Sequence, residues 1–149
     1  MDILEMLAAN EEAIANLYRA YAARFSEYAT FWNHLAKEEI THAAVIRKYG
    51  NEVEQGLVHL NEKRFNKEAL KTYSNYIKRE LDLAQEARLS LMHAFSTAFY
   101  IEQSLIEASF FEVFEGDSEE LKRLLSQLKA NTKEHLHKVR KAMVEQKSS

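Results

Sequence analysis

The apolar residues of this chain recur every three to four positions, and they do so in five stretches separated by polar segments. These stretches are residues 3–25, 31–49, 67–83, 90–115 and 119–143. A period of 3.6 residues places such side chains on one face of an α-helix, whereas no stretch alternates as a β-strand would. With no proline and only three glycines, little in the chain interrupts a helix. The pattern therefore predicts an all-α protein.

The connections between the stretches predict two helical hairpins. Residues 26–30 form a short connection, so the second helix is expected to return antiparallel to the first. Residues 51–89 form a long crossover that contains the amphipathic stretch 67–83. A long crossover between two hairpins is the connectivity of ferritin-like four-helix bundles. We therefore expect one ferritin-like domain over residues 1–149, with an extra helix in the crossover.

Local signals predict where individual helices begin and end. Gly50 is expected to end the second helix as a C-terminal cap. Asp117 or Ser118 is expected to cap the start of the last helix. Residues 144–149 follow the last apolar position and are expected to fray.

Acidic and imidazole side chains lie within the apolar helix faces. Glu39 and His42 lie three residues apart in the middle of the face of the second helix. Glu11 lies in the apolar face of the first helix, and Glu102 lies near the centre of the face of helix 90–115. A buried charge is costly, so such a group normally neutralises, pairs or binds a metal ion. Two interpretations remain open: His42 hydrogen-bonds Glu39 in a satisfied core, or both ligate one ion.

The two halves of the chain repeat this arrangement. A gapless alignment of the second helix with the last one pairs Leu35 with Leu128, Glu39 with Thr132, His42 with His135, Ile46 with Val139 and Arg47 with Arg140. Each half thus has an inward glutamate on its first helix and an inward histidine on its second. The residues expected to converge between the four helices are Glu11, Glu39, His42, Glu102 and His135.

A second Glu-x-x-His sequence, at Glu134 and His137, lies on a different face of its helix. Both residues fall about 140–160° from the centre of the apolar stripe at 100° per residue. We therefore predict that they face solvent, whereas Thr132 and His135 lie within the stripe.

The amino-acid composition limits the kinds of site and partner that the chain can have. The chain contains no cysteine, which excludes disulfides, Cys-ligated zinc, iron–sulfur clusters and a cysteine nucleophile. Carboxylate and imidazole ligands suit iron, manganese or zinc. A net charge of −3 gives no general attraction to nucleic acid or anionic lipid. With no signal-peptide pattern and no apolar run near the roughly 18 residues of a spanning helix, we expect a cytoplasmic protein that binds neither nucleic acid nor membrane.

The motifs resemble the ferritin-like superfamily and most closely the di-iron domain of rubrerythrins. That family has Glu on helix one, Glu-x-x-His on helix two, Glu on helix three and Glu-x-x-His on helix four. The likeness is carried by residues 10–18, 31–43 and 101–107 and by the segment that leads to His135. The resemblance as a whole covers most of the chain, and these segments are its best-matching parts.

Two departures from the family pattern affect the expected chemistry. Rubrerythrins carry a C-terminal rubredoxin domain with four cysteines, and this chain has none. Thr132 stands where the family has its fourth-helix glutamate, one of two that tend to bridge the irons. Glu107 and Glu134 are candidate additional ligands if the last helix rotates or reorganises.

The resemblance implies a non-haem iron oxidoreductase that oxidises ferrous iron and reduces peroxide or O2, as a peroxidase or ferroxidase. It implies two iron ions and an external electron donor; with a ligand missing, a single iron, manganese or zinc ion is the alternative. The carboxylate ligands are then Glu11, Glu39 and Glu102, and the imidazole ligands are His42 and His135. Tyr18 lies two turns from Glu11 and is either a hydrogen-bond partner of the ligands or an ordinary core tyrosine.

Two other functions remain open. One is a ferritin-like helical module whose metal site is degenerate and which catalyses nothing. The other is iron storage, for which the sequence identifies none of the exterior interfaces that a 24-subunit shell needs. Aromatic residues at or beyond the edges of the core faces favour self-association, and we expect a homodimer. They are Tyr73, Tyr76, Phe110, Phe111 and Phe114.

Overall fold

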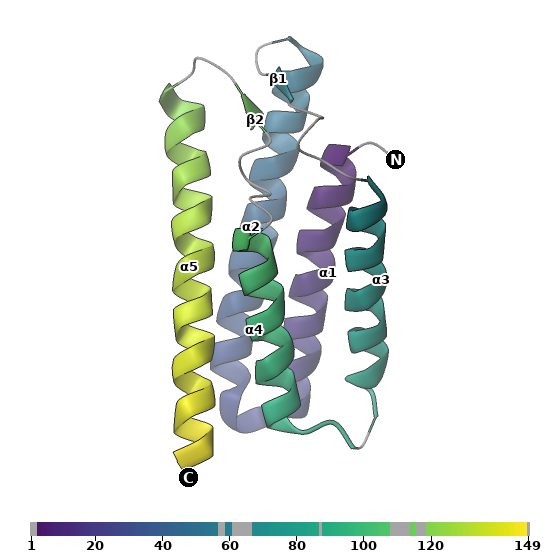
Figure 1. Ribbon diagram of the computed structural model, residues 1–149, viewed down its shortest axis with the longest axis vertical. Helices are drawn as coiled ribbons and strands as arrows, with labels where there is room; N and C mark the ends of the chain where they lie inside the picture. Colours follow the sequence, from purple (N-terminus) through teal and green to yellow (C-terminus); the bar gives the residue numbers. More distant parts are fainter. Residues whose placement is uncertain are drawn as a thin grey trace. The chain divides into compact units, whose positions relative to one another are not determined.

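The chain is all-α, as predicted. A computed structural model describes residues 3–56, 59–60, 67–86, 88–107, 114–115 and 119–148. Over these residues it has five α-helices, one 3-10 turn and two strands of two residues each (Figure 1). The elements form two compact units, each described by itself below. The first unit is built on α1, α2 and α3, and the second on α4, α5 and the two strands.

The first unit contains the first predicted hairpin. Helix α1 spans Ile3–Arg24, a 3-10 turn follows at Ser26–Tyr28, and α2 spans Ala29–Glu54. The two helices are antiparallel, because the ring of Trp32 near the start of α2 meets the ring of Tyr21 near the end of α1 in an edge-on contact. The Trp32 and Tyr21 ring centroids lie 4.9 Å apart. At the other end, Arg47 of α2 pairs with Glu5 of α1.

The predicted crossover helix is confirmed at its predicted bounds. Helix α3 spans Lys67–Leu83. It packs along α1 within the first unit (Figure 1). Leu70, Tyr73 and Ile77 lie on its buried face, as the amphipathic pattern predicts. Tyr73 is buried here and Tyr76 is partly buried, so the two rings expose little surface for contact with a second copy of the chain.

The prediction that Gly50 ends the second helix is wrong. Helix α2 continues through Gly50 to Glu54. Gly50 faces α1, where an added Cβ would lie 3.4 Å from Leu4 Cδ1, and its neighbour Tyr49 is buried. Packing on α1 therefore continues past this point and outweighs the roughly 1 kcal/mol that a helical glycine costs. The glycine that ends the helix is Gly56, with φ of +77° and its N–H bonded to the Val53 carbonyl at 3.0 Å.

The second unit contains the second hairpin. Helix α4 spans Leu91–Glu107, and α5 spans Glu119–Ser148. Ser90 caps the start of α4, because its Oγ accepts a hydrogen bond from the backbone N–H of His93 at 3.0 Å. Glu102 of α4 meets His135 of α5, and Phe99 meets Arg140, so the two helices run antiparallel.

Two predicted features of the second unit are wrong. Residues 114 and 115 were expected inside a helix, but Phe114–Glu115 form strand β2. This strand pairs antiparallel with strand β1, His59–Leu60, so its backbone hydrogen bonds go to another strand instead of a helix. The end of α5 does not fray at residue 143 but continues to Ser148, where Lys147 in the last turn complements the helix dipole.

Several predictions fall on residues outside the described ranges. These are the capping roles of Asp117 and Ser118 and the surface placement of Phe110 and Phe111. The side chains of Glu107 and Phe114 are likewise outside the description. Among the described residues, no helix has the length and apolar character needed to cross a membrane.

Candidate metal centre

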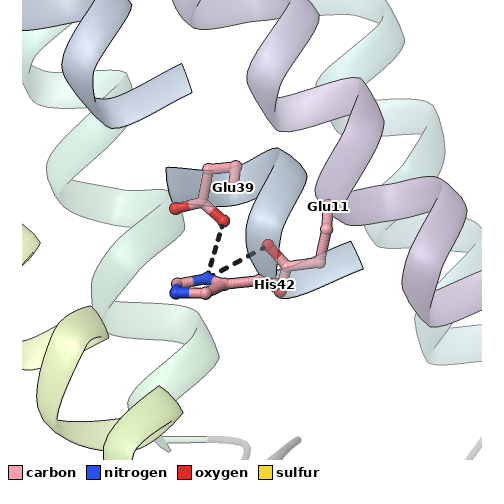
Figure 2. Close-up of side chains that lie close together, drawn as sticks. All are labelled: Glu11, Glu39 and His42. Carbon is pink, nitrogen blue, oxygen red and sulfur yellow. Dashed lines mark ion pairs between the residues drawn. The ribbon is translucent and has the colours of Figure 1, made fainter. Parts of the chain in front are cut away.

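The first hairpin buries two carboxylates around one imidazole. Figure 2 shows Glu11 on α1 and Glu39 and His42 on α2, with both carboxylates directed at the imidazole. His42 Nδ1 lies 3.3 Å from Glu39 Oε2 and 4.0 Å from Glu11 Oε2. The residues are 3%, 0% and 1% exposed for Glu11, Glu39 and His42 respectively. The predicted inward orientation of all three is confirmed.

The helix spacing explains this placement. The buried residues of α2 form one stripe, and Glu39 and His42 lie at its centre, between Leu35 and Ile46. Side chains three apart on a helix lie on the same face, so the two point the same way. The antiparallel return of α2 along α1 then brings the buried Glu11 to the same place.

The second hairpin repeats the pairing with one carboxylate fewer. Glu102 Oε1 of α4 lies 3.6 Å from His135 Nδ1 of α5, and both side chains are fully buried. Thr132 is also buried, at the position aligned with Glu39. Its Oγ1 donates a hydrogen bond to the Leu128 carbonyl at 2.9 Å, one turn earlier in the same helix. The threonine hydroxyl is therefore engaged with its own helix backbone.

The two hairpins share one feature at the histidine. In each, Nδ1 of the second-helix histidine faces a carboxylate from the first helix. The gapless alignment is confirmed at the level of burial, since all of its apolar pairs are buried. These are Leu35 with Leu128 and Ile46 with Val139.

The donor atoms of the first hairpin are close enough for one ion. One oxygen each from Glu11 and Glu39 and one nitrogen of His42 all lie within 4.8 Å of one another. Ligands that are each about 2.1 Å from a metal ion lie roughly 3 to 3.4 Å apart. The observed separations of 3.3 and 4.0 Å approach that spacing, so these three groups could hold one ion.

Glu134 and His137 lie on the surface, as predicted. The Glu134 side chain is 57% exposed and forms an ion pair with Lys138 at 3.3 Å. His137 is exposed on the same helix. The structure therefore does not bring Glu134 to His135 or Glu102 as an additional ligand. The corresponding suggestion for Glu107 concerns a side chain outside the described residues and stays a prediction.

Tyr18 is fully buried, and its observed neighbours are aromatic. Its ring centroid lies 5.5 Å from that of Trp32 and 6.5 Å from that of Tyr21. This packing fits the ordinary core role that the sequence left open. A hydrogen bond from Tyr18 to a ligand stays a prediction.

One arginine joins the two helices of each hairpin, and the two arginines occupy aligned positions. The sequence did not reveal this role. The Arg47 guanidinium pairs with Glu5 at 2.9 Å and also with Glu12, both on α1. The hydrogen bond to Glu5 has the largest effect and the one to Glu12 the next largest, and both raise the pKa of Arg47. Arg140 lies over the ring of Phe99 on α4, 5.4 Å from its centroid. The alignment of Arg47 with Arg140 was the signal in the sequence that could have indicated a shared role. The sequence does not show which residue either arginine contacts.

Glu80 of α3 is a buried carboxylate that the sequence analysis did not select. It lies three residues after Ile77 on the buried face of the crossover helix, and this spacing was the available signal.

No family model, curated protein or solved structure matches this chain. The resemblance to the ferritin-like superfamily therefore depends on the motifs themselves. What the geometry adds is that the inward residues of each hairpin are buried together.

Proposed function

We propose that this chain is a ferritin-like, non-haem metal-binding protein and an oxidoreductase of rubrerythrin type. The observation that carries the proposal is the buried set of Glu11, Glu39 and His42, whose donor atoms lie within 4.8 Å of one another. The metal is iron, and its reaction is oxidation of the ferrous ion coupled to reduction of peroxide or O2.

Charge favours a cation at this place over a core of hydrogen bonds alone. Two carboxylates approach the same nitrogen, His42 Nδ1, from two different helices. A single ring nitrogen carries at most one hydrogen, so this contact alone does not neutralise two carboxylate charges. A divalent ion among the three groups offsets the charge of both carboxylates while accepting the lone pair of the imidazole.

The ligand types also indicate the class of metal. Carboxylate and imidazole donors without sulfur suit iron, manganese or zinc. Three protein ligands leave coordination positions for small molecules, and a bound redox metal supplies electron transfer to O2 or peroxide there. The protein residues would hold the ion with two buried carboxylates and one buried imidazole, away from bulk water.

The resemblance to rubrerythrins extends the proposal to a ferritin-like bundle with a dinuclear centre. Its ligands are Glu11, Glu39, His42, Glu102 and His135. The repeated carboxylate–Nδ1 pairing in the second hairpin supports it. An external electron donor and a homodimer belong to the same proposal.

A catalytically silent helical module is the second candidate. It is favoured by Thr132, whose hydroxyl bonds to the Leu128 carbonyl where the family has a ligand. Replacing Glu39 and His42 together with leucine separates the two candidates by thermal unfolding with and without ferrous iron. A metal-free module keeps or gains stability, because buried polar pairs are often replaceable by apolar residues. A metalloprotein loses its metal-dependent stabilisation.

Redox turnover is tested on protein loaded anaerobically with ferrous iron and mixed with hydrogen peroxide. We expect one hydrogen peroxide to be consumed for every two ferrous ions oxidised. The rise of ferric absorbance measures the iron oxidation. The Glu39→Ala variant should lose this reaction, and Glu134→Ala, which alters the exposed Glu-x-x-His sequence, should retain it. Equal rates in both variants, or no reaction beyond that of free iron, would contradict the proposal.

A further inference from the structure

We infer that an aromatic cluster in the first hairpin carries electrons from the protein surface to the buried carboxylates and imidazole. The aromatic cluster consists of Tyr18, Tyr21, Tyr28, Phe31 and Trp32, whose rings contact one another. Its outermost tyrosine gives up an electron that is used to reduce peroxide. This inference rests on the proposed function and assigns a redox role to residues that ligate no metal.

The aromatic cluster begins two helical turns from the two buried carboxylates. Tyr18 follows Glu11 by seven residues on α1, and Trp32 precedes Glu39 by seven residues on α2. Residues seven apart share a helix face and lie about 10 Å apart along the axis. Because the helices are antiparallel, both rings lie toward the end where α1 is joined to α2 (Figure 1). The two rings meet there, with centroids 5.5 Å apart.

Ring contacts continue from this pair toward the surface. The Trp32 centroid lies 4.9 Å from that of Tyr21 and 5.0 Å from that of Phe31. The Phe31 centroid in turn lies 6.3 Å from that of Tyr28. Trp32 and Tyr21 are fully buried, whereas Phe31 and Tyr28 are partly exposed. Electron tunnelling weakens steeply with distance, so a series of packed rings favours transfer in short steps between the core and the surface.

The residue types favour a redox role over packing alone. Tyrosine and tryptophan lose one electron far more readily than phenylalanine or aliphatic side chains do. Trp32, the only tryptophan of the chain, is at the centre of the aromatic cluster. Seven residues from the same carboxylates in the opposite direction, the chain has Leu4 and Ile46 instead. At this spacing, oxidisable rings therefore lie only on the side that faces the turn.

Tyr28 is the member of the aromatic cluster that is best placed to hold the missing electron. Removal of an electron makes a phenol strongly acidic, so a tyrosine is oxidised readily only where its proton can leave. Tyr18 and Tyr21 are fully buried, and a positive charge on a ring in apolar surroundings is costly. Tyr28 is partly exposed, in a 3-10 turn that contains no buried residue. Its proton can therefore pass to water.

The electron count of peroxide reduction gives the aromatic cluster its task. Reduction of hydrogen peroxide to two waters breaks the O–O bond and takes two electrons and two protons. One ferrous ion supplies one electron and becomes ferric. Tyr28 supplies the second electron and, from its O–H bond, one proton, and it becomes a neutral radical, while solvent supplies the other proton.

The Tyr28 radical is then reduced from outside the protein. A small one-electron donor, or a further ferrous ion, supplies the electron, and solvent returns the proton to the phenol. When iron is the only reductant, the overall ratio therefore stays at two ferrous ions for each peroxide. The partly exposed ring of Tyr28 is thus the point where the external donor acts.

The first test is made on the metal-free full chain. A laser flash at the red edge of indole absorption ejects an electron from Trp32, because the chain has no other tryptophan. We expect the absorbance of the indole radical to decay as that of a tyrosyl radical rises. Tyr28→Phe should lose most of the tyrosyl signal. Tyr49→Phe, which alters a buried tyrosine seven residues beyond His42, should keep it.

The second test follows the same radical during peroxide reduction. The full chain is loaded anaerobically with less than one ferrous ion per chain, so that few chains hold two, and is mixed with hydrogen peroxide. Freeze-quenched electron paramagnetic resonance should show a tyrosyl radical, identified by narrower lines when the tyrosines are ring-deuterated. Tyr28→Phe and Trp32→Phe should lose most of this signal, and Tyr49→Phe should keep it. If Trp32→Phe does not fold, Tyr28→Phe decides.

The outcomes separate the inference from the function on which it rests. No tyrosyl signal after the flash, or an undiminished signal in Tyr28→Phe, would overturn the route through the aromatic cluster. Iron oxidation by peroxide without a radical at Tyr28 would overturn the inference and leave the proposed function standing. Failure to bind iron would overturn the proposed function and, with it, the delivery of electrons to peroxide.

Discussion

At the scale of single residues, the two hairpins differ most at the buried positions 39 and 132. Glu39 directs a carboxylate at His42 Nδ1, whereas Thr132 returns its hydroxyl to its own helix. The burial of both could be predicted from helical spacing alone, because each falls within an apolar stripe. The hydroxyl's bond to the Leu128 carbonyl could not, because threonine in a helix has more than one rotamer available.

Thr132→Val tests whether the threonine hydroxyl has any part in metal binding. We expect unchanged metal content and a free energy of unfolding altered by less than about 1 kcal/mol, because the bond is made to an intrahelical carbonyl. Denaturant unfolding and metal analysis measure both quantities. Loss of bound metal would show that Thr132 is itself a ligand.

At the scale of the helices, hydrophobic spacing predicted where the elements lie, but their ends depended on contacts between elements. Helix α3 was predicted at its observed bounds because its stripe begins and ends with the helix. Helix α2 passes through Gly50 because it continues to pack on α1. The pairing of Phe114–Glu115 with β1 involves residues far apart in sequence, which a helical period does not reveal.

Alanine at the two glycines tests where α2 ends. Gly50→Ala should stabilise the protein by up to about 1 kcal/mol, because alanine is the better helix former and the Leu4 contact of 3.4 Å is tolerable. Gly56→Ala should destabilise it by about 1 kcal/mol or more, since its φ is +77°. Denaturant midpoints compare the two. Stabilisation by alanine at position 56 would contradict the observed helix end.

The Arg47 contacts give a second prediction about how helices are held together. Arg47→Ala should destabilise the first hairpin by less than about 1 kcal/mol, because the side chain is 42% exposed and solvent screens the pairs. The pKa of Arg47 is raised, so the pairing is fully present below the pKa of unfolded arginine. It is lost only as pH rises through the higher folded value, and the penalty should be constant between neutral and mildly alkaline pH.

The dependence on salt distinguishes the contribution of the Arg47 ion pairs to stability from a contribution of packing. The Arg47→Ala penalty should shrink at 1 M salt, where surface charges are screened, and the exposed Lys37→Ala should serve as the matched control. Denaturant unfolding at low and high salt measures the difference. A penalty that is independent of salt would indicate that Arg47 acts through its aliphatic stem.

At the scale of the whole molecule, the chain consists of two units that bury equivalent residues. The repeat was visible in the sequence because Glu11 with His42 and Glu102 with His135 fall in matching stripes. The five inward polar residues were all found at buried positions. Sequence could not provide the distances within each set, because these depend on how far α2 and α5 rotate against their partners. A single domain and a homodimer remain predictions.

Metal binding by buried glutamate and histidine is the foundation of both proposals. The most direct measurement is metal content per chain by plasma mass spectrometry, after anaerobic reconstitution with ferrous iron and removal of loosely bound ions. We predict at least one iron per chain in wild type and in Glu134→Ala, and loss of the tightly bound iron in Glu39→Ala. Folded wild-type protein without bound iron, or a Glu39→Ala variant that keeps it, would contradict metal binding at this site.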